Sequence, residues 1–173
     1  LIDVIGSEKK ICKYLDLPIQ HISDKVLRLM NRKTTKREIT KLIHALRKKI
    51  PGLVLRTSVI VGFPGETDKD FKELLKFLKD ARFDRLGAFI YSREEGTRAS
   101  RFKGQVSDSL KEERYDQVMK LQQGISIRSG KRFLGKTVDV LIDEKAAGED
   151  NKDLESFIGR TQGDAPEIDG VVY

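Results

Sequence analysis

The chain has 173 residues, of which 38% are hydrophobic and 35% are charged, with a net charge of +7. This composition supports a buried core in one medium-sized domain or slightly more. No apolar run approaches the roughly 20 residues of a membrane span, so we expect no membrane segment. The single cysteine, Cys12, excludes an internal disulfide and a metal site built from several cysteines of this chain. It fits a reducing, cytoplasmic compartment, and its apolar neighbours predict a buried thiol.

Charge is distributed unevenly along the sequence. From Leu134 onward there are ten acidic and four basic residues, whereas residues 1–133 contain 17 acidic and 30 basic ones. Such a division indicates two modules with different partners. The chain also begins without Met and stops inside a predicted strand, so we expect it to be a piece of a longer protein.

Hydrophobic periodicity predicts alternating strands and helices in the first two thirds of the chain. We expect a first helix capped by Gly6 and three strands, over residues 11–19, 54–61 and 85–91. A second helix should begin at Ser23, a third after a capping box of Thr35 and Glu38, and a fourth should cover residues 67–81. This order is typical of βα units with a parallel sheet. Three strands are too few to close a barrel, so we expect about half of one.

The pattern changes in the last third of the chain. Residues 107–132 predict a long polar helix with a narrow apolar seam that includes Val118 and Ile125, which we interpret as a connector. From Lys136 the apolar period is two, as in an antiparallel strand. A polar loop over residues 146–153 and short strands over residues 157–160 and 171–173 should follow. The predicted division is a half-barrel over residues 1–104, a connector over residues 105–133, and the start of a small β-barrel over residues 134–173.

Residues 55–67, LRTSVIVGFPGET, are the most informative stretch. An apolar strand runs into a turn that contains Gly62 and Gly65, and an acidic helix start follows. Ligands of parallel α/β folds bind at the carboxyl ends of strands, and glycine lets a flat ligand lie on the backbone. We expect Glu66 to accept hydrogen bonds from amides of its own turn. An ordinary strand-to-helix turn would have the same pattern, so this stretch alone does not distinguish a ligand site from such a turn.

Three motifs together resemble the radical S-adenosylmethionine methylthiotransferases. They are YLDLPIQHISD from residue 14, VGFPGET from residue 61, and FIYS with EGT within residues 89–97. Two features are similar to the RimO type, which methylthiolates an aspartate of small-subunit ribosomal protein twelve. These are PIQH at residues 18–21, where enzymes acting on tRNA read Pro-x-Gln-Ser-Gly, and the stretch over residues 157–173.

The resemblance implies an α/β fold, half of a radical SAM (βα) partial TIM-like barrel followed by the start of an antiparallel TRAM β-barrel. It also implies S-adenosylmethionine and two 4Fe-4S clusters in the full-length protein. A 5′-deoxyadenosyl radical would abstract hydrogen from the substrate carbon, and the second cluster would assist sulfur insertion. The cluster-binding motif CxxxCxxC is absent from this chain. We therefore expect no metal ligands in it and no activity of the chain alone.

Six residues are implied as cofactor-binding, and none is assigned a catalytic role: Gln20, His21, Arg56, Gly62, Phe63 and Tyr91. Gly62 and Phe63 would contact the adenine. Gln20 and His21 would bind the ribose or the amino-acid end, although a histidine after a strand is more often a structural hydrogen-bonding group. Tyr91 could stack on the cofactor or belong to the core. Arg56 could pair with a cofactor carboxylate or form a salt bridge at the bottom of the barrel.

The acidic segment from Leu134 bears on the partner. A barrel that binds tRNA should be basic, whereas an acidic one should attract a basic ribosomal protein. Two alternatives stay open, namely methylthiolation of a tRNA adenosine and a non-catalytic binding module. The module is disfavoured because a half-barrel would expose wide apolar edges, and a CxxxCxxC upstream would dismiss it.

Overall fold

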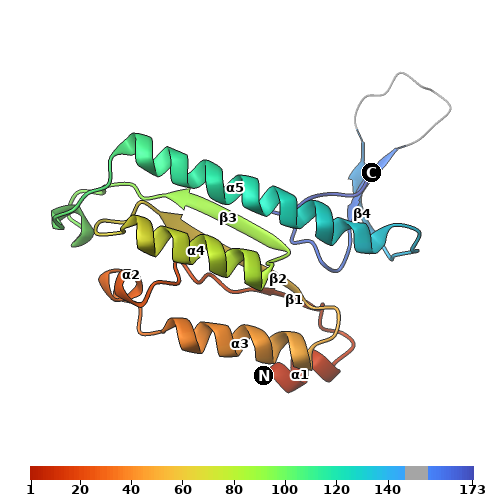
Figure 1. Cartoon of the computed structure of the whole chain (residues 1–173). Helices are drawn as coiled ribbons and strands as arrows, with labels where there is room; N and C mark the ends of the chain where they lie inside the picture. The colour runs from red at the N-terminus through yellow and green to blue at the C-terminus, as the bar shows by residue number, and fades with distance from the viewer. Residues whose placement is uncertain (147–155) are drawn as a thin grey trace.

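The computed structural model describes residues 1–146 and 156–173, which form a parallel sheet with its helices and a small antiparallel sheet (Figure 1). The elements are α1 Ile2–Ser7, β1 Tyr14–Asp16, α2 Asp24–Leu29, α3 Lys36–Lys49, β2 Val54–Val61, α4 Asp68–Ala81, β3 Arg85–Ile90, the 3-10 helix η1 Ala99–Arg101, α5 Asp108–Gly130, the 3-10 helix η2 Lys131–Phe133, β4 Leu141–Lys145 and β5 Phe157–Arg160. The predicted strands over residues 54–61 and 157–160 are confirmed. Most of the predicted loop over residues 146–153 lies outside the described residues.

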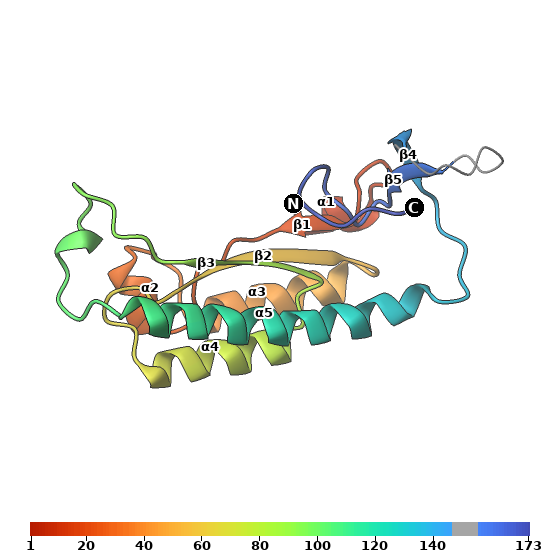
Figure 2. The same ribbon diagram turned by 90° about the horizontal axis from the view of Figure 1, so that it is seen from above.

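The parallel sheet has the order β1-β2-β3. Leu15 pairs with Leu55, and Val61 pairs with Ile90, so the carboxyl ends of the strands lie at one edge. Helices α3, α4 and α5 cover one face of this sheet (Figure 2). Alternate residues of β2 (Leu55, Val59 and Val61) join the main core on that face. The predicted half-barrel of βα units is confirmed.

Local sequence signals explain where the two outer helices begin. Thr35 caps α3 and forms the expected capping box with Glu38. Thr67 and Asp70 form a second box at the start of α4. In both, the hydroxyl accepts the third backbone N–H and the carboxylate accepts the capping residue's N–H, which satisfies two otherwise free donors. These boxes fix the helices that follow the turns at the sheet edges.

Helix α5 does more than connect the two modules. Val118 and Ile125 are buried, and Val118 belongs to the main core beside β2 and α4. Gln122 donates to the carbonyl of Phe83 at 3.0 Å. The helix therefore forms part of the layer that covers the sheet, in addition to linking it to residues 134–173, which we call the tail.

Five local predictions were wrong. Gly6 lies inside α1, whose C-cap is Glu8. The first strand is only Tyr14–Asp16, because beyond it only Gln20 forms a bridge to β2. Cys12 is exposed rather than buried. Residues 136–140 form no strand; β4 begins at Leu141, and the strand expected near the C-terminus is reduced to a bridge between Val172 and Gly159.

The tail lies over the face of the sheet that the helices leave uncovered (Figure 2). Asp169 accepts a hydrogen bond from the Tyr14 hydroxyl at 2.7 Å, and its other oxygen lies 3.7 Å from Arg56 Nε and 3.9 Å from Arg85 Nε. Asp164 forms a second ion pair with Arg85. Arg56 and Arg85 are register neighbours on adjacent strands, so these carboxylates separate two like charges. These contacts hold the tail beside the amino-terminal halves of the sheet's strands.

We expect Asp169→Asn to loosen the tail. The amide keeps the shape of the side chain but removes the charge that faces two arginines, and the Asp169 carboxylate is only 4% exposed. Hydrogen exchange of the Ala165 and Gly159 amides in the full-length protein should become about ten-fold faster, a change of about 1.4 kcal/mol in the opening free energy. Glu167→Gln, an exposed change in the same turn, is the matched control. Equal exchange rates in the two variants would contradict the conclusion that Asp169 holds the tail on the sheet.

Candidate functional site

The turn after β2 is built around one carboxylate. Gly62 and Gly65 have positive φ angles of 73° and 85°, which glycine adopts without steric cost. They fold the chain so that Glu66 reaches back and accepts the backbone N–H groups of Gly62 and Phe63. The expected role of Glu66 is confirmed. The peptide planes at the end of β2 are therefore held by a side chain of the same turn.

A cation of α5 completes this arrangement. Arg114 lies 3.4 Å from Glu66 Oε1 and 2.7 Å from Asp68, and its guanidinium stacks over Phe71 with 5.3 Å to the ring centre. The side chains of Arg114 and Glu66 are 2% and 0% exposed. Burial raises the pKa of Glu66 to about 7, against Arg114 and the two amides, which lower it. The carboxyl group therefore titrates near neutral pH.

The stability contribution of Glu66 should depend on pH. Because its pKa is raised from 4.5 to about 7 on folding, its contribution is complete below about pH 4.5 and is lost as the pH rises through about 7. As the pH rises from about 4.5 through about 7, the unfolding free energy of the full-length protein should fall relative to that of Glu66→Gln. Urea unfolding at several pH values measures this difference, with the exposed Glu112→Gln as control. Parallel pH profiles of the parent and Glu66→Gln would contradict the raised pKa.

Lys111, also on α5, occupies the space beside Gly62. A Cβ added at Gly62 would overlap the Cγ of Lys111. The Lys111 ammonium lies 5.6 Å from the ring centre of Tyr91 and 2.9 Å from Asp108. Glycine at position 62 is therefore required both by its φ angle and by the close approach of α5. In this structure the Lys111 stem fills the space that a side chain at position 62 would occupy.

An apolar cluster lies at the carboxyl end of the sheet. Val26, Phe63 and Tyr91 are buried together, and Phe102 from the loop after β3 packs against them. The rings of Phe63 and Tyr91 meet edge to face at 5.1 Å. In the described part of the chain the buried Tyr91 hydroxyl has no hydrogen-bond partner. A buried apolar cluster with a free hydroxyl group is a candidate contact surface for a flat heteroaromatic ligand.

Gln20 and His21 belong to the same edge of the sheet. The Gln20 backbone bonds to Ser58 and Ile60 of β2, and its φ of 66° turns the chain there. His21 is fully buried, and its Nδ1 accepts the N–H of Ser23 at 3.0 Å. Burial lowers the pKa of His21 to about 4, so the ring is neutral with its proton on Nε2. This geometry gives His21 a structural hydrogen bond and leaves Nε2 without a partner among the described residues.

Five of the six predicted site residues therefore gather at the carboxyl end of the sheet, and Arg56 does not. Arg56 lies in the first half of β2, where it pairs with Asp16 at 2.5 Å and faces Asp169. Of the two roles expected for Arg56, the structure shows the salt bridge at the bottom of the barrel. Its guanidinium is committed to carboxylates of the protein.

Lys111 and Arg114 were missed as site residues, although the sequence carries a signal for them. The buried positions of α5 are Lys111, Arg114, Val118, Gln122 and Ile125. Extending the apolar seam toward the helix start by steps of three and four residues reaches both cations. Charged residues on a buried helix face are rare unless they are paired, so their positions could have indicated a function.

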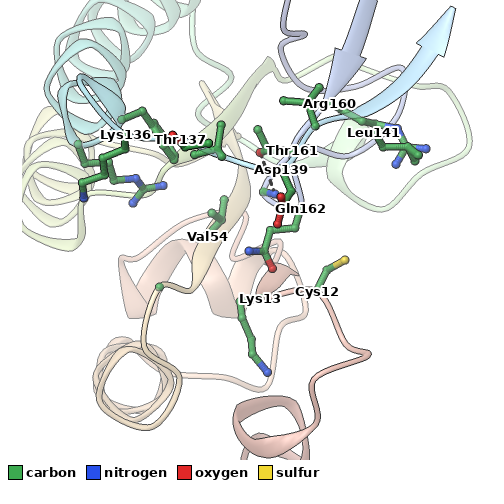
Figure 3. Close-up of a pocket in the computed structure, with 16 residues that line it drawn as sticks. Cys12, Lys13, Val54, Lys136, Thr137, Asp139, Leu141, Arg160, Thr161 and Gln162 are labelled. Atoms are coloured by element: carbon green, nitrogen blue, oxygen red, sulfur yellow. Dashed lines mark hydrogen bonds between the residues drawn. The ribbon is translucent and has the colours of Figure 1, made fainter.

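A pocket of about 860 Å³ lies elsewhere, between the start of the half-barrel and the tail (Figure 3). Its walls include Cys12, Val54, Asp139 and Thr161. It contains none of the six predicted site residues. Among the described residues no group of three His, Cys, Asp or Glu side chains could hold a metal ion. In residues 1–146 and 156–173, no helix combines the length and apolar character that crossing a bilayer requires.

Comparisons with known proteins define the class. Residues 2–78 match the Radical SAM superfamily, and residues 134–173 match the TRAM domain. The fold is similar to that of coproporphyrinogen III oxidase (HemN) from Escherichia coli, with a TM-score of 0.55 and 22% identity over 79% of this chain and 31% of the other. Residues 2–78 are therefore of the radical SAM type, and residues 134–173 are of the TRAM type.

The whole chain also matches more similar relatives. It is 51% identical to "Ribosomal protein uS12 methylthiotransferase RimO" of Clostridioides difficile and 49% identical to the protein of that name in Pelotomaculum thermopropionicum. Both matches cover all of this chain and 38% of the relative. Over its whole length the chain is therefore similar to proteins named as RimO methylthiotransferases. It spans little more than a third of the length of these relatives.

The residues present fit one of the cofactors that this family implies. The apolar cluster and the unpartnered Tyr91 hydroxyl at the carboxyl edge suit the adenine of S-adenosylmethionine. The 4Fe-4S clusters find no ligand set in the described residues, and the one cysteine lies near the amino end of β1. The described residues therefore offer candidate contacts for an adenosyl group and no ligand set for a cluster.

Proposed function

We propose that this chain is the part of a radical SAM methylthiotransferase that holds the adenosyl group of S-adenosylmethionine at the carboxyl end of its sheet. In this proposal the full-length protein adds a methylthio group to an aspartate of ribosomal protein uS12. The observation that carries the proposal is the roughly 50% identity to RimO proteins over all 173 residues.

The residues of this chain would bind and orient rather than react. Phe63 and Tyr91 would pack on the adenine and exclude water from it. Glu66, held by Arg114, would keep the amides of Gly62 and Phe63 in place, so that the carbonyl groups of the turn face the ligand in one orientation. The bound cofactor, together with an iron–sulfur cluster, supplies the radical chemistry at the substrate carbon.

The contacts of the tail change the charge argument for the partner. Asp164 and Asp169 are used to hold the tail on Arg85 and Arg56, and Asp143 pairs with Arg160. These carboxylates are not free to attract a basic protein. Support for a ribosomal protein over tRNA therefore rests on the sequence identity and on the PIQH motif, and less on the acidic tail.

The test uses the full-length protein, reconstituted anaerobically with iron and sulfide and supplied with S-adenosylmethionine and reductant. Ribosomal protein uS12 and tRNA are offered separately, and methylthio mass increases are measured by mass spectrometry. We expect an increase on the ribosomal protein and none without S-adenosylmethionine. An increase on tRNA alone would refute the proposed substrate.

A further inference from the structure

Basic side chains surround the carboxyl end of the sheet, outside the apolar cluster. They come from α2 with the turn after it and from the loop after β3, and all are exposed: Arg28, Arg32, Lys33, Arg93, Arg98, Arg101 and Lys103. We call these seven residues the basic rim. The two segments meet at Gly65, whose N–H donates to the Gly104 carbonyl at 2.9 Å and which lies against Leu29. Both lie at the same end of the molecule in Figures 1 and 2.

The carboxylates near the rim do not neutralise it. Asp24 accepts the backbone N–H of Lys36 at 2.6 Å, and Asp68 pairs with Arg114. Asp70 is bound by Ser23 and Lys25. Within residues 1–146 and 156–173 no ion pair reaches any of the seven rim cations. Two exposed carboxylates, Glu94 and Glu95, lie in the same loop as Arg93 and Arg98. Against these two acidic residues, the seven cations leave the rim with a net positive charge next to the proposed adenosyl site.

Three of the rim arginines are held in place by contacts that leave their terminal nitrogens free. Arg28 donates through Nε to the carbonyl of Asp24 at 3.1 Å, and Arg93 donates through Nε to the carbonyl of Ser100 at 2.9 Å. Arg98 stacks over Phe102 with 5.7 Å to the ring centre, and Phe102 packs edge to face on Phe63. A guanidinium fixed in this way can bind a phosphate through two nitrogens with little further loss of entropy.

We propose that the basic rim binds phosphates of RNA, so that the enzyme recognises its ribosomal protein inside an RNA-containing small-subunit particle. This inference rests on the proposed function and names the form of the substrate. A free ribosomal protein is itself basic, and the rim would repel it at the entrance to the site. The phosphates that surround the same protein in a ribosomal particle would be attracted, and each contact would release counterions.

The experiment uses the reconstituted full-length protein and three substrates: free ribosomal protein uS12, small subunits that lack the modification, and tRNA. The rim variants are Arg32→Glu/Lys33→Glu and Arg101→Glu/Lys103→Glu, whose side chains form no bond in the described structure. The matched control is Lys41→Glu/Lys120→Glu, which reverses two exposed charges in the middle of α3 and α5. Methylthio incorporation gives kcat/KM, and particle binding is measured over a range of salt concentrations.

We expect kcat/KM on the particle to exceed that on the free protein by at least about ten-fold. Each rim variant should lower the particle value about ten-fold and reduce the salt slope of particle binding by about 1 per lost contact. It should not lower the free-protein value, and should raise it where the repulsion of the basic protein is relieved. Equal use of both substrates, or equal loss on both in the rim variants, would overturn the inference. Modification of neither ribosomal form would refute the proposed function, and the binding series would still decide whether the rim contacts RNA. Modification of tRNA alone would refute both.

Discussion

Replacing Arg114 by alanine should destabilise the half-barrel by about 3–5 kcal/mol, the usual result of removing one partner from a buried ion pair. The Glu66 carboxylate would stay fully buried against the amides of Gly62 and Phe63 without its cation. The loss should be smaller at pH 6 than at pH 8, because the unpaired carboxyl group takes up a proton and its pKa rises further. The turn at the end of β2 should also open more often.

Hydrogen exchange of β2 and α4 in the full-length protein measures this effect segment by segment. Arg128→Ala removes an exposed arginine of the same helix and should change stability by less than about 0.5 kcal/mol. The double variant Arg114→Met/Glu66→Gln removes both charges and should recover much of the loss, since a neutral pair leaves no unpaired ion. If the double variant were as unstable as Arg114→Ala, the unpaired charge of Glu66 would not be the cause of the loss.

The sequence predicted what depends on neighbours along the chain. β2 is a largely apolar run, interrupted by Arg56, Thr57 and Ser58, that lies between Gly52 and Gly62, so both of its ends were predictable. The capping box of Thr35 and the reach of Glu66 to its own turn involve residues three or four positions apart. Parallel order followed from the alternation of strand and helix, and it places most of the candidate site at one edge of the sheet.

The sequence could not predict what depends on distant segments. Arg56 meets Asp169, and nothing in either local pattern indicates that the tail crosses this face of the sheet. The buried face of α5 was difficult to recognise because Lys111, Arg114 and Gln122 interrupt its apolar seam. Cys12 was expected inside because Ile11 and Leu17 flank it, yet it lies in an irregular segment before β1 and is exposed. In each case the burial or pairing of the side chain depended on which distant segments pack against it, and local sequence patterns do not indicate this.

Replacing Gly62 by alanine should lower the affinity for S-adenosylmethionine about ten-fold or more. The φ of 73° costs an L-residue about 1–2 kcal/mol, and the new Cβ would displace the Lys111 stem and, with it, the start of α5. Equilibrium dialysis with the reconstituted full-length protein measures the affinity directly, without turnover. Gly52→Ala is the matched control, because Gly52 has a φ of 76° and open space around it. It should show the backbone strain without the loss of affinity.

The contribution of Lys111 can be separated from the strain. In Gly62→Ala/Lys111→Ala the new methyl group enters the space that the lysine stem leaves, so crowding is relieved while the φ penalty remains. We expect the double variant to bind S-adenosylmethionine more tightly than Gly62→Ala. Weaker binding by the double variant would mean that the Lys111 ammonium itself contacts the cofactor. Unchanged binding in Gly62→Ala would place the adenosyl site away from this turn, and α5 would then support the fold alone.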